Sequence, residues 1–104
     1  MELVFKALAD QNRRKMLDRL FADPGLTLSE LIHGLEMTRQ SASRHVSILE
    51  SAGLIVIHWS GREKLHYLNP VPLVEITDRW LDKFTHDNAR ALLALKQDLE
   101  GNKK

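Results

Sequence analysis

One switch of hydrophobic period, at Gly53, limits the folds open to this chain of 104 residues. Before Gly53, apolar residues recur at the spacing of amphipathic helices. After it, residues 54–59 form a β-branched run with an aromatic end, and residues 64–68 alternate with period two. Ser60-Gly61-Arg62-Glu63 lies between these runs and is typical of a hairpin turn. The chain is therefore predicted to place a two-stranded hairpin directly after a helix.

Two short helices are predicted immediately before Gly53. Thr27-Leu28-Ser29-Glu30 fits a capping box, in which the threonine hydroxyl accepts from a free backbone N–H and Glu30 reaches back to the cap. Thr38 can cap the second helix, over about residues 39–52, and Gly53 suits the left-handed conformation that follows a helix end. Residues 27–52 are thus predicted to form a helix-turn-helix, with residues 54–68 as the wing beside it.

Further helical patterns flank this region. Residues 2–9 and about 11–22 are predicted helices, with Asp10 as the cap of the second and residues 23–25 as its stop. That second helix is expected to show a basic run to solvent or a partner and to bury one apolar face. The basic run is Arg13, Arg14 and Lys15, and the buried residues are Met16, Leu17, Leu20 and Phe21.

The C-terminal part is also predicted to be helical. After Asn69-Pro70, an apolar stripe runs from Leu73 to Phe84 and resumes after a break from Leu92 to Leu99. The predicted fold is mainly α with a small β-hairpin, in the order α-α-α-α-β-β-α with C-terminal helices. This order is that of a winged helix-turn-helix, here as one domain over residues 1–104.

Composition excludes several classes of function. The chain has no cysteine, which removes disulfides, thiolate metal sites and cysteine nucleophiles. It has no apolar run long enough to cross a bilayer and no signal-peptide pattern at its start, so we expect a cytoplasmic protein without a membrane partner. No phosphate loop or catalytic triad pattern is present, and we expect no enzyme. A net charge of +1 means that any DNA footprint depends on local charge.

Local charge and helix geometry favour double-stranded DNA as the partner. With Ala42 facing the core, Gln40, Ser43, Arg44 and Ser47 lie on the opposite face of the 39–52 helix. Arginine and glutamine can read base edges in the major groove, and serine hydroxyls serve bases or phosphates. An exposed helix face is commonly polar without binding DNA, so the flanking elements carry the prediction. Near the hairpin turn, Arg62 and Lys64 are placed to reach phosphates or the minor groove.

Other residues leave alternatives open. Ile48, on the same helix, hints at a winged-helix docking module that binds protein in place of DNA. Trp59 and Tyr67 are expected to pack the hairpin against the helices. His58 and His66 lie on adjacent strands, and facing each other they would offer a metal two imidazoles, with a carboxylate such as Glu63 as a third ligand.

Four fragments in sequence order resemble the ArsR-type winged-helix repressors, many of which sense metals. Residues 5–17, FKALADQNRRKML, are similar to the opening "LADxxRRxIL" signature of that family. Residues 27–31, TLSEL, resemble its "xTVxEL" helix start, and residues 43–55, SRHVSILESAGLI, its recognition helix and exit "SRHLxxLxxAGLV". Residues 61–67, GREKLHY, resemble its "GRxxxY" wing. The resemblance covers nearly the whole chain.

The resemblance implies a homodimer that binds an inverted-repeat operator and represses transcription. Its dimer helices correspond to residues 1–22 and 73–99. The residues expected at the dimer interface are Leu3, Val4, Leu73, Ile76, Trp80, Phe84, Leu92 and Leu95. For Trp80 and Phe84, packing within the chain's own core is an equal alternative. The DNA contacts that it implies are Gln40, Ser43, Arg44, His45, Ser47 and Arg62, and the local positive charge adds Arg39 and Lys64 to the residues expected to bind DNA. For His45, at the edge of the buried face, a structural hydrogen bond to backbone is an equal alternative.

The chain departs from the family at its metal sites. Where metal-sensing members carry a "CxC" pair, this sequence has Leu31-Ile32-His33-Gly34-Leu35. Where other members place an Asp-x-His pair and a later His-x-x-Glu, it has Asp78-Arg79-Trp80 and Asp82-Lys83-Phe84, with His86 nearby. We therefore predict no metal site and no cofactor.

Overall fold

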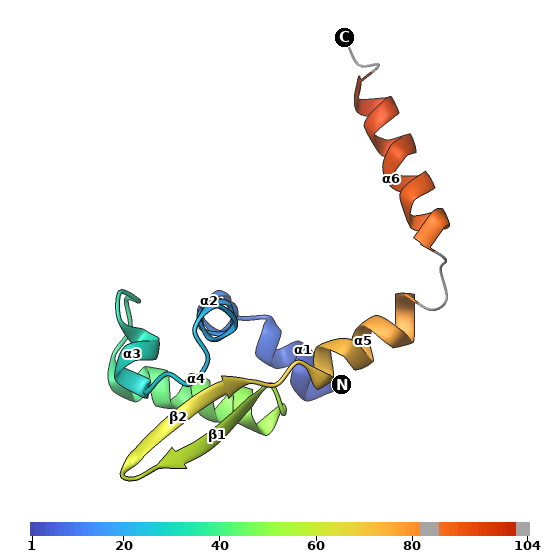
Figure 1. Ribbon diagram of the computed structural model, residues 1–104. Helices are drawn as coiled ribbons and strands as arrows, with labels where there is room; N and C mark the ends of the chain where they lie inside the picture. Colours follow the sequence, from blue (N-terminus) through green and yellow to red (C-terminus); the bar gives the residue numbers. More distant parts are fainter. Residues whose placement is uncertain (82–85, 102–104) are drawn as a thin grey trace. The chain divides into compact units, whose positions relative to one another are not determined.

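The computed structural model describes residues 1–81 and 86–101 and confirms the predicted order of helices and hairpin. The chain divides into two compact units, residues 1–73 and 74–104. The elements of the first unit are helices α1 (Glu2–Leu8), α2 (Gln11–Ala22), α3 (Leu28–Ile32) and α4 (Arg39–Ser51) and strands β1 (Ile55–Ser60) and β2 (Glu63–Leu68) (Figure 1). Helix α5 (Val71–Leu81) begins in the first unit and continues into the second, which also holds α6 (His86–Gly101).

Three side-chain caps fix where α2, α3 and α4 begin. The Asp10 carboxylate accepts from the Arg13 backbone N–H at 3.1 Å, and this bond holds the pKa of Asp10 below its ordinary value. Thr27 and Glu30 form the complete predicted capping box, and the Thr27 backbone N–H lowers the pKa of the Glu30 carboxyl in the same way. Thr38 accepts from the Ser41 N–H at 3.0 Å. Gly53, at φ +76°, ends the helical region as predicted.

The core of the first unit lies between the four helices and the base of the hairpin. Helix α4 contacts α1, α2, α3 and β1, so it is held along its length by packing on one side. The side chains that bury this core are Val4, Ala7, Met16, Leu17, Leu20, Leu31, Ala42, Val46, Leu49, Leu54 and Ile55. The predicted burial of Phe21 is wrong, because its side chain is 79% exposed. Phe21 lies about 100° around the helix from Leu20, past the edge of the buried stripe.

The hairpin has a two-residue turn and a fixed antiparallel register. Ser60 pairs with Glu63 across Gly61-Arg62, and Gly61 has φ +61°, the positive value that such tight turns require. A single bridge between Leu26 and His66 joins β2 to the segment before α3. In it, the Gly25 N–H donates to the His66 carbonyl, and the His66 N–H donates to the Leu26 carbonyl. The base of the wing is therefore tied to the connection between α2 and α3.

The suggested metal pair in the hairpin is wrong. His66 pairs with Ile57, whereas His58 pairs with Leu65, so the two imidazoles lie on opposite faces. His66 is 3% exposed, and its Nδ1 lies 2.8 Å from the Leu26 carbonyl, to which it donates because a carbonyl only accepts. A one-residue difference in register thus separates the two side chains.

The second unit presents apolar side chains on its helices. Helix α5 has no buried residue, and the α6 stripe of Leu92, Leu95 and Leu99 is between 55% and 64% exposed. No helix in the described part of the chain is long and apolar enough to span a membrane.

Candidate nucleic-acid interface

Helix α4 buries one face and leaves the predicted polar face open. Ala42, Val46 and Leu49, at helical spacing, are at most 7% exposed. The four side chains expected on the opposite face are all exposed: Gln40, Ser43, Arg44 and Ser47. Because the Thr38 cap and the packed face fix the helix, this row of donors and acceptors is held in one orientation.

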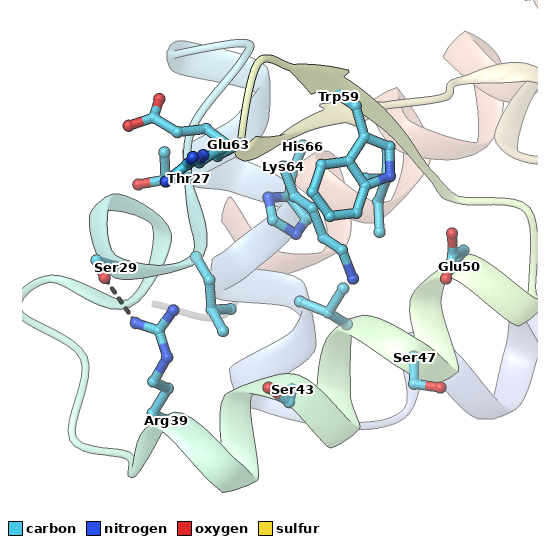
Figure 2. A pocket seen from close by; sticks show the side chains of 14 residues that line it. Thr27, Ser29, Arg39, Ser43, Ser47, Glu50, Trp59, Glu63, Lys64 and His66 are labelled. Atoms are coloured by element: carbon cyan, nitrogen blue, oxygen red, sulfur yellow. Dashed lines mark hydrogen bonds between the residues drawn. The ribbon is translucent and has the colours of Figure 1, made fainter.

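A groove of about 820 Å³ lies between α4 and the hairpin. Figure 2 shows Ser43 and Ser47 on the α4 wall, with Trp59 and Lys64 opposite them on the hairpin. Arg39 lines the groove at the start of α4, where its Nη1 donates to the Ser29 hydroxyl at 2.7 Å. The groove therefore joins three elements: the start of α3, the open side of α4 and the inner face of the wing.

The expectation that Trp59 packs against the helices is wrong. Trp59 lies on the same hairpin face as Ile55 and Ile57, yet exposure rises along this face from 2% at Ile55 to 58% at Trp59. Lys64 pairs directly with Trp59, and its Nζ lies 5.1 Å from the centre of the indole ring. The indole thus lines the groove, on the part of the wing that the helices do not cover.

Tyr67, in contrast, does pack at the base of the hairpin. It is half-buried, and its ring lies against Gly25, where an added Cβ would meet the phenol oxygen at 3.1 Å. Gly25 also has φ +84°, so both the backbone and the tyrosine require glycine at this turn.

Two arginines of the basic run on α2 brace the end of α1; Arg13 is half-buried, whereas Arg14 and Lys15 are exposed, as the sequence predicts. Arg13 donates through Nε to the Ala7 carbonyl at 2.8 Å and through Nη2 to the Lys6 carbonyl at 3.0 Å. Arg14 donates through Nη1 to the Leu8 carbonyl at 2.7 Å. The two arginines therefore satisfy the Ala7 and Leu8 carbonyls at the end of α1, whereas the Lys6 carbonyl also accepts from the Ala9 N–H at 3.3 Å.

Arg13 also fixes His45 on α4. Its Nη1 lies 3.2 Å from the His45 Nδ1, and a guanidinium only donates, so the histidine nitrogen accepts and carries no proton. The structural alternative for His45 is a hydrogen bond to backbone; its Nδ1 instead bonds to a side chain of α2. The ring is held with Nε2 as its second hydrogen-bonding atom.

The comparisons with known proteins point in one direction. A helix-turn-helix domain family matches residues 8–58, which include α2, α3 and α4. The uncharacterized HTH-type transcriptional regulator YuzN of Bacillus subtilis is 36% identical over 78% of this chain and 95% of its own length. The transcriptional repressor SdpR of Bacillus subtilis is 32% identical over 81% of this chain and 91% of its own length.

A solved structure extends the likeness to the three-dimensional fold. The crystal structure of the ArsR family transcriptional regulator RHA00566 is 30% identical and covers 99% of this chain and 92% of its own, with a TM-score of 0.64. This chain belongs to the ArsR family. The ArsR-type resemblance predicted from the four sequence fragments is confirmed, and the protein is a DNA-binding transcriptional regulator, not an enzyme.

The residues expected at the dimer interface of this ArsR-family regulator differ in exposure. Val4 is 7% exposed and belongs to the chain's own core, whereas the neighbouring Leu3 is 57% exposed. Leu73 and Ile76 are half-buried. Trp80, Leu92 and Leu95 are exposed, and Phe84 lies outside the described residues.

The metal sites of the family have no counterpart among the residues described for this regulator. No three histidine, cysteine, aspartate or glutamate side chains in residues 1–81 and 90–101 come together in a group that can hold an ion, and the side chain of His86 lies outside this range. His33, which follows α3 where metal-sensing members place cysteines, is exposed.

Proposed function

We propose that this ArsR-family regulator is a homodimeric repressor that reads an inverted-repeat operator with α4 in the major groove and the hairpin over the neighbouring minor groove. The main support for this proposal is the polar face of α4, which is exposed along its length while the opposite face is buried. A major groove about 12 Å wide admits one helix held in this way. Repression is supported by the similarity to a protein named as a transcriptional repressor.

Each exposed side chain of this surface has a role in the proposal. Arg44 and Gln40 suit guanine and adenine edges, because each can form two hydrogen bonds with one base. Ser43 and Ser47 supply hydroxyls for phosphates or bases, and His45 has Nε2–H available as a donor. Three cations complete the footprint along phosphates: Arg39, Arg62 and Lys64.

A second copy of the chain is the proposed cover for the exposed apolar side chains. Leu92, Leu95 and Leu99 recur at helical spacing on α6, and Trp80 and Leu81 are 40% and 45% exposed on α5. Leu3 on α1 adds to this set. A twofold dimer would present two α4 helices about 34 Å apart, matching half-sites one helical turn apart. Such a regulator acts in the cytoplasm, where its DNA partner is found, and requires no cofactor.

One observation favours docking to a protein. Ile48 is 41% exposed and lines a smaller groove of about 330 Å³ on the α1 side of α4, together with Leu3. An apolar side chain of a partner protein would fill such a groove.

Light scattering with gel-shift titration tests the proposal. The repressor hypothesis requires a dimer that retains a random-sequence duplex at low salt and loses it as salt rises. A monomer, or a chain that leaves duplex DNA unshifted at low salt, would contradict it and favour docking. The Ile48→Ser variant serves as the matched control, because removal of this side chain affects docking and spares the polar DNA face.

A further inference from the structure

We propose that the groove between α4 and the hairpin holds the sugar–phosphate strand that separates the major from the minor groove, with Trp59 packed against its sugars. This inference rests on the proposed DNA binding. If α4 occupies the major groove and the wing reaches the adjacent minor groove, one DNA strand must pass between them. The space available for it is the groove of about 820 Å³ between these two elements.

Trp59 is placed for such a contact by the hairpin itself. Its strand pairing fixes the backbone, and Lys64 stands 5.1 Å from the ring on the paired position. The side chain remains 58% exposed, so its apolar surface is available for burial. An indole face covers the apolar side of a deoxyribose, and its Nε1–H can donate to a phosphate oxygen. Aromatic side chains beside a cationic track are a common way of holding a nucleic-acid strand.

The other walls supply groups that bind phosphate. Ser43 and Ser47 face the hairpin from α4, and Arg39 and Ser29 meet at the start of the groove (Figure 2). Hydroxyls are frequent phosphate ligands in protein–DNA interfaces. The chemistry of the lining is therefore apolar at the indole and polar around it, as a strand of alternating sugar and phosphate requires.

The small net charge of the groove explains why the uncharged Trp59 indole is important for the affinity for DNA. Its lining has three cations, Arg39, Arg62 and Lys64, and two carboxylates, Glu50 and Glu63. The excess of positive charge is therefore small, and the attraction to phosphate is correspondingly weak. Burial of the indole and hydroxyl hydrogen bonds then contribute a larger share of the affinity.

The test follows the affinity and the fluorescence of the full chain with a random-sequence duplex. We expect Trp59→Ala to weaken binding about five- to tenfold without changing the slope of log affinity against log salt, because an indole neutralises no phosphate. Lys64→Ala should reduce that slope. His58→Ala is the matched control, since His58 is exposed on the opposite face of the same strand, and it should bind like the wild type.

Fluorescence supplies a direct readout of the contact. The wild-type protein should show a change of emission on binding DNA, and Trp59→Phe, which retains Trp80, should lack most of it. Duplex binding with unchanged affinity in Trp59→Ala, or an equal emission change in Trp59→Phe, would overturn this inference while leaving DNA binding intact. Failure of the wild type to bind any duplex would overturn the proposed function and this inference with it.

Discussion

Removal of the Arg13 guanidinium tests the brace that connects α1, α2 and the recognition helix. Arg13→Met retains much of the aliphatic stem but loses hydrogen bonds to the Ala7 carbonyl, the Lys6 carbonyl and the His45 Nδ1. Because Arg13 is half-buried, the freed acceptors regain water in part, and we assign each bond about 0.7 kcal/mol. The expected loss is about 2 kcal/mol in the free energy of unfolding, or about 10 °C in Tm.

Urea unfolding followed by circular dichroism, at one fixed protein concentration, measures this loss. Lys15→Met is the matched control, because Lys15 is exposed on the same helix, and it should cost less than about 0.5 kcal/mol. A double-mutant cycle with His45→Ala should show coupling, because the two side chains are in contact. Equal stabilities for Arg13→Met and Lys15→Met would refute the brace.

Three further predictions concern DNA binding and pH. Arg44→Ala should weaken binding to the operator by about 1–3 kcal/mol, with a smaller loss on random DNA, in a fluorescence anisotropy titration; equal losses on both would remove its role in reading bases. Arg62→Ala should lower affinity for all sequences and reduce the salt slope by about 0.9, and an unchanged slope would remove the wing from the phosphate footprint. Asp10→Ala should cost about 1 kcal/mol at pH 7, from loss of the helix cap. Because the folded-state pKa of Asp10 is lowered, the stability from its ionised form is present above the pKa of an aspartate in the unfolded chain. That stability is lost as pH falls through the folded-state pKa, so the difference between variant and wild type should shrink in acid unfolding.

Local features of the fold could be predicted from the sequence because their causes lie within a few residues. The caps at Asp10, Thr27 and Thr38 each accept from a backbone N–H three residues later. Gly53 and Gly61 have the positive φ that a helix end and a tight turn require. Such signals set the order of the elements, and the recurrence of apolar residues then indicates which face of α4 is buried.

Features that depend on packing between elements could not be predicted in this way. Trp59 follows the alternation of a buried strand face, but the alternation does not show where the helices cease to cover that face. Arg13 looks like a surface charge in the sequence. Its hydrogen-bond acceptors lie on α1 and α4, so the sequence pattern of α2 does not show them. To predict whether His58 and His66 share a face of the hairpin, the exact strand register is required, because a shift of one residue moves a side chain to the other face.

The proposed DNA-binding surface was predicted in part. The outward face of α4 follows from helix geometry, and all four of its polar side chains are exposed. The groove beside α4 does not follow from helix geometry, because the hairpin and α4 together form its walls. One sequence signal was available: a tryptophan two residues before the turn glycine lies further along the wing than Ile55 and Ile57.

Operator recognition by α4 is tested most directly by selection of bound sites from a random duplex library with the purified full chain. It predicts an enriched inverted repeat whose half-sites lie about one helical turn, or about 10 base pairs, apart. Arg44→Ala should lose enrichment at one symmetric pair of positions. A library that shows no enriched sequence after repeated rounds, although the protein retains duplex DNA at low salt, would contradict operator recognition by α4.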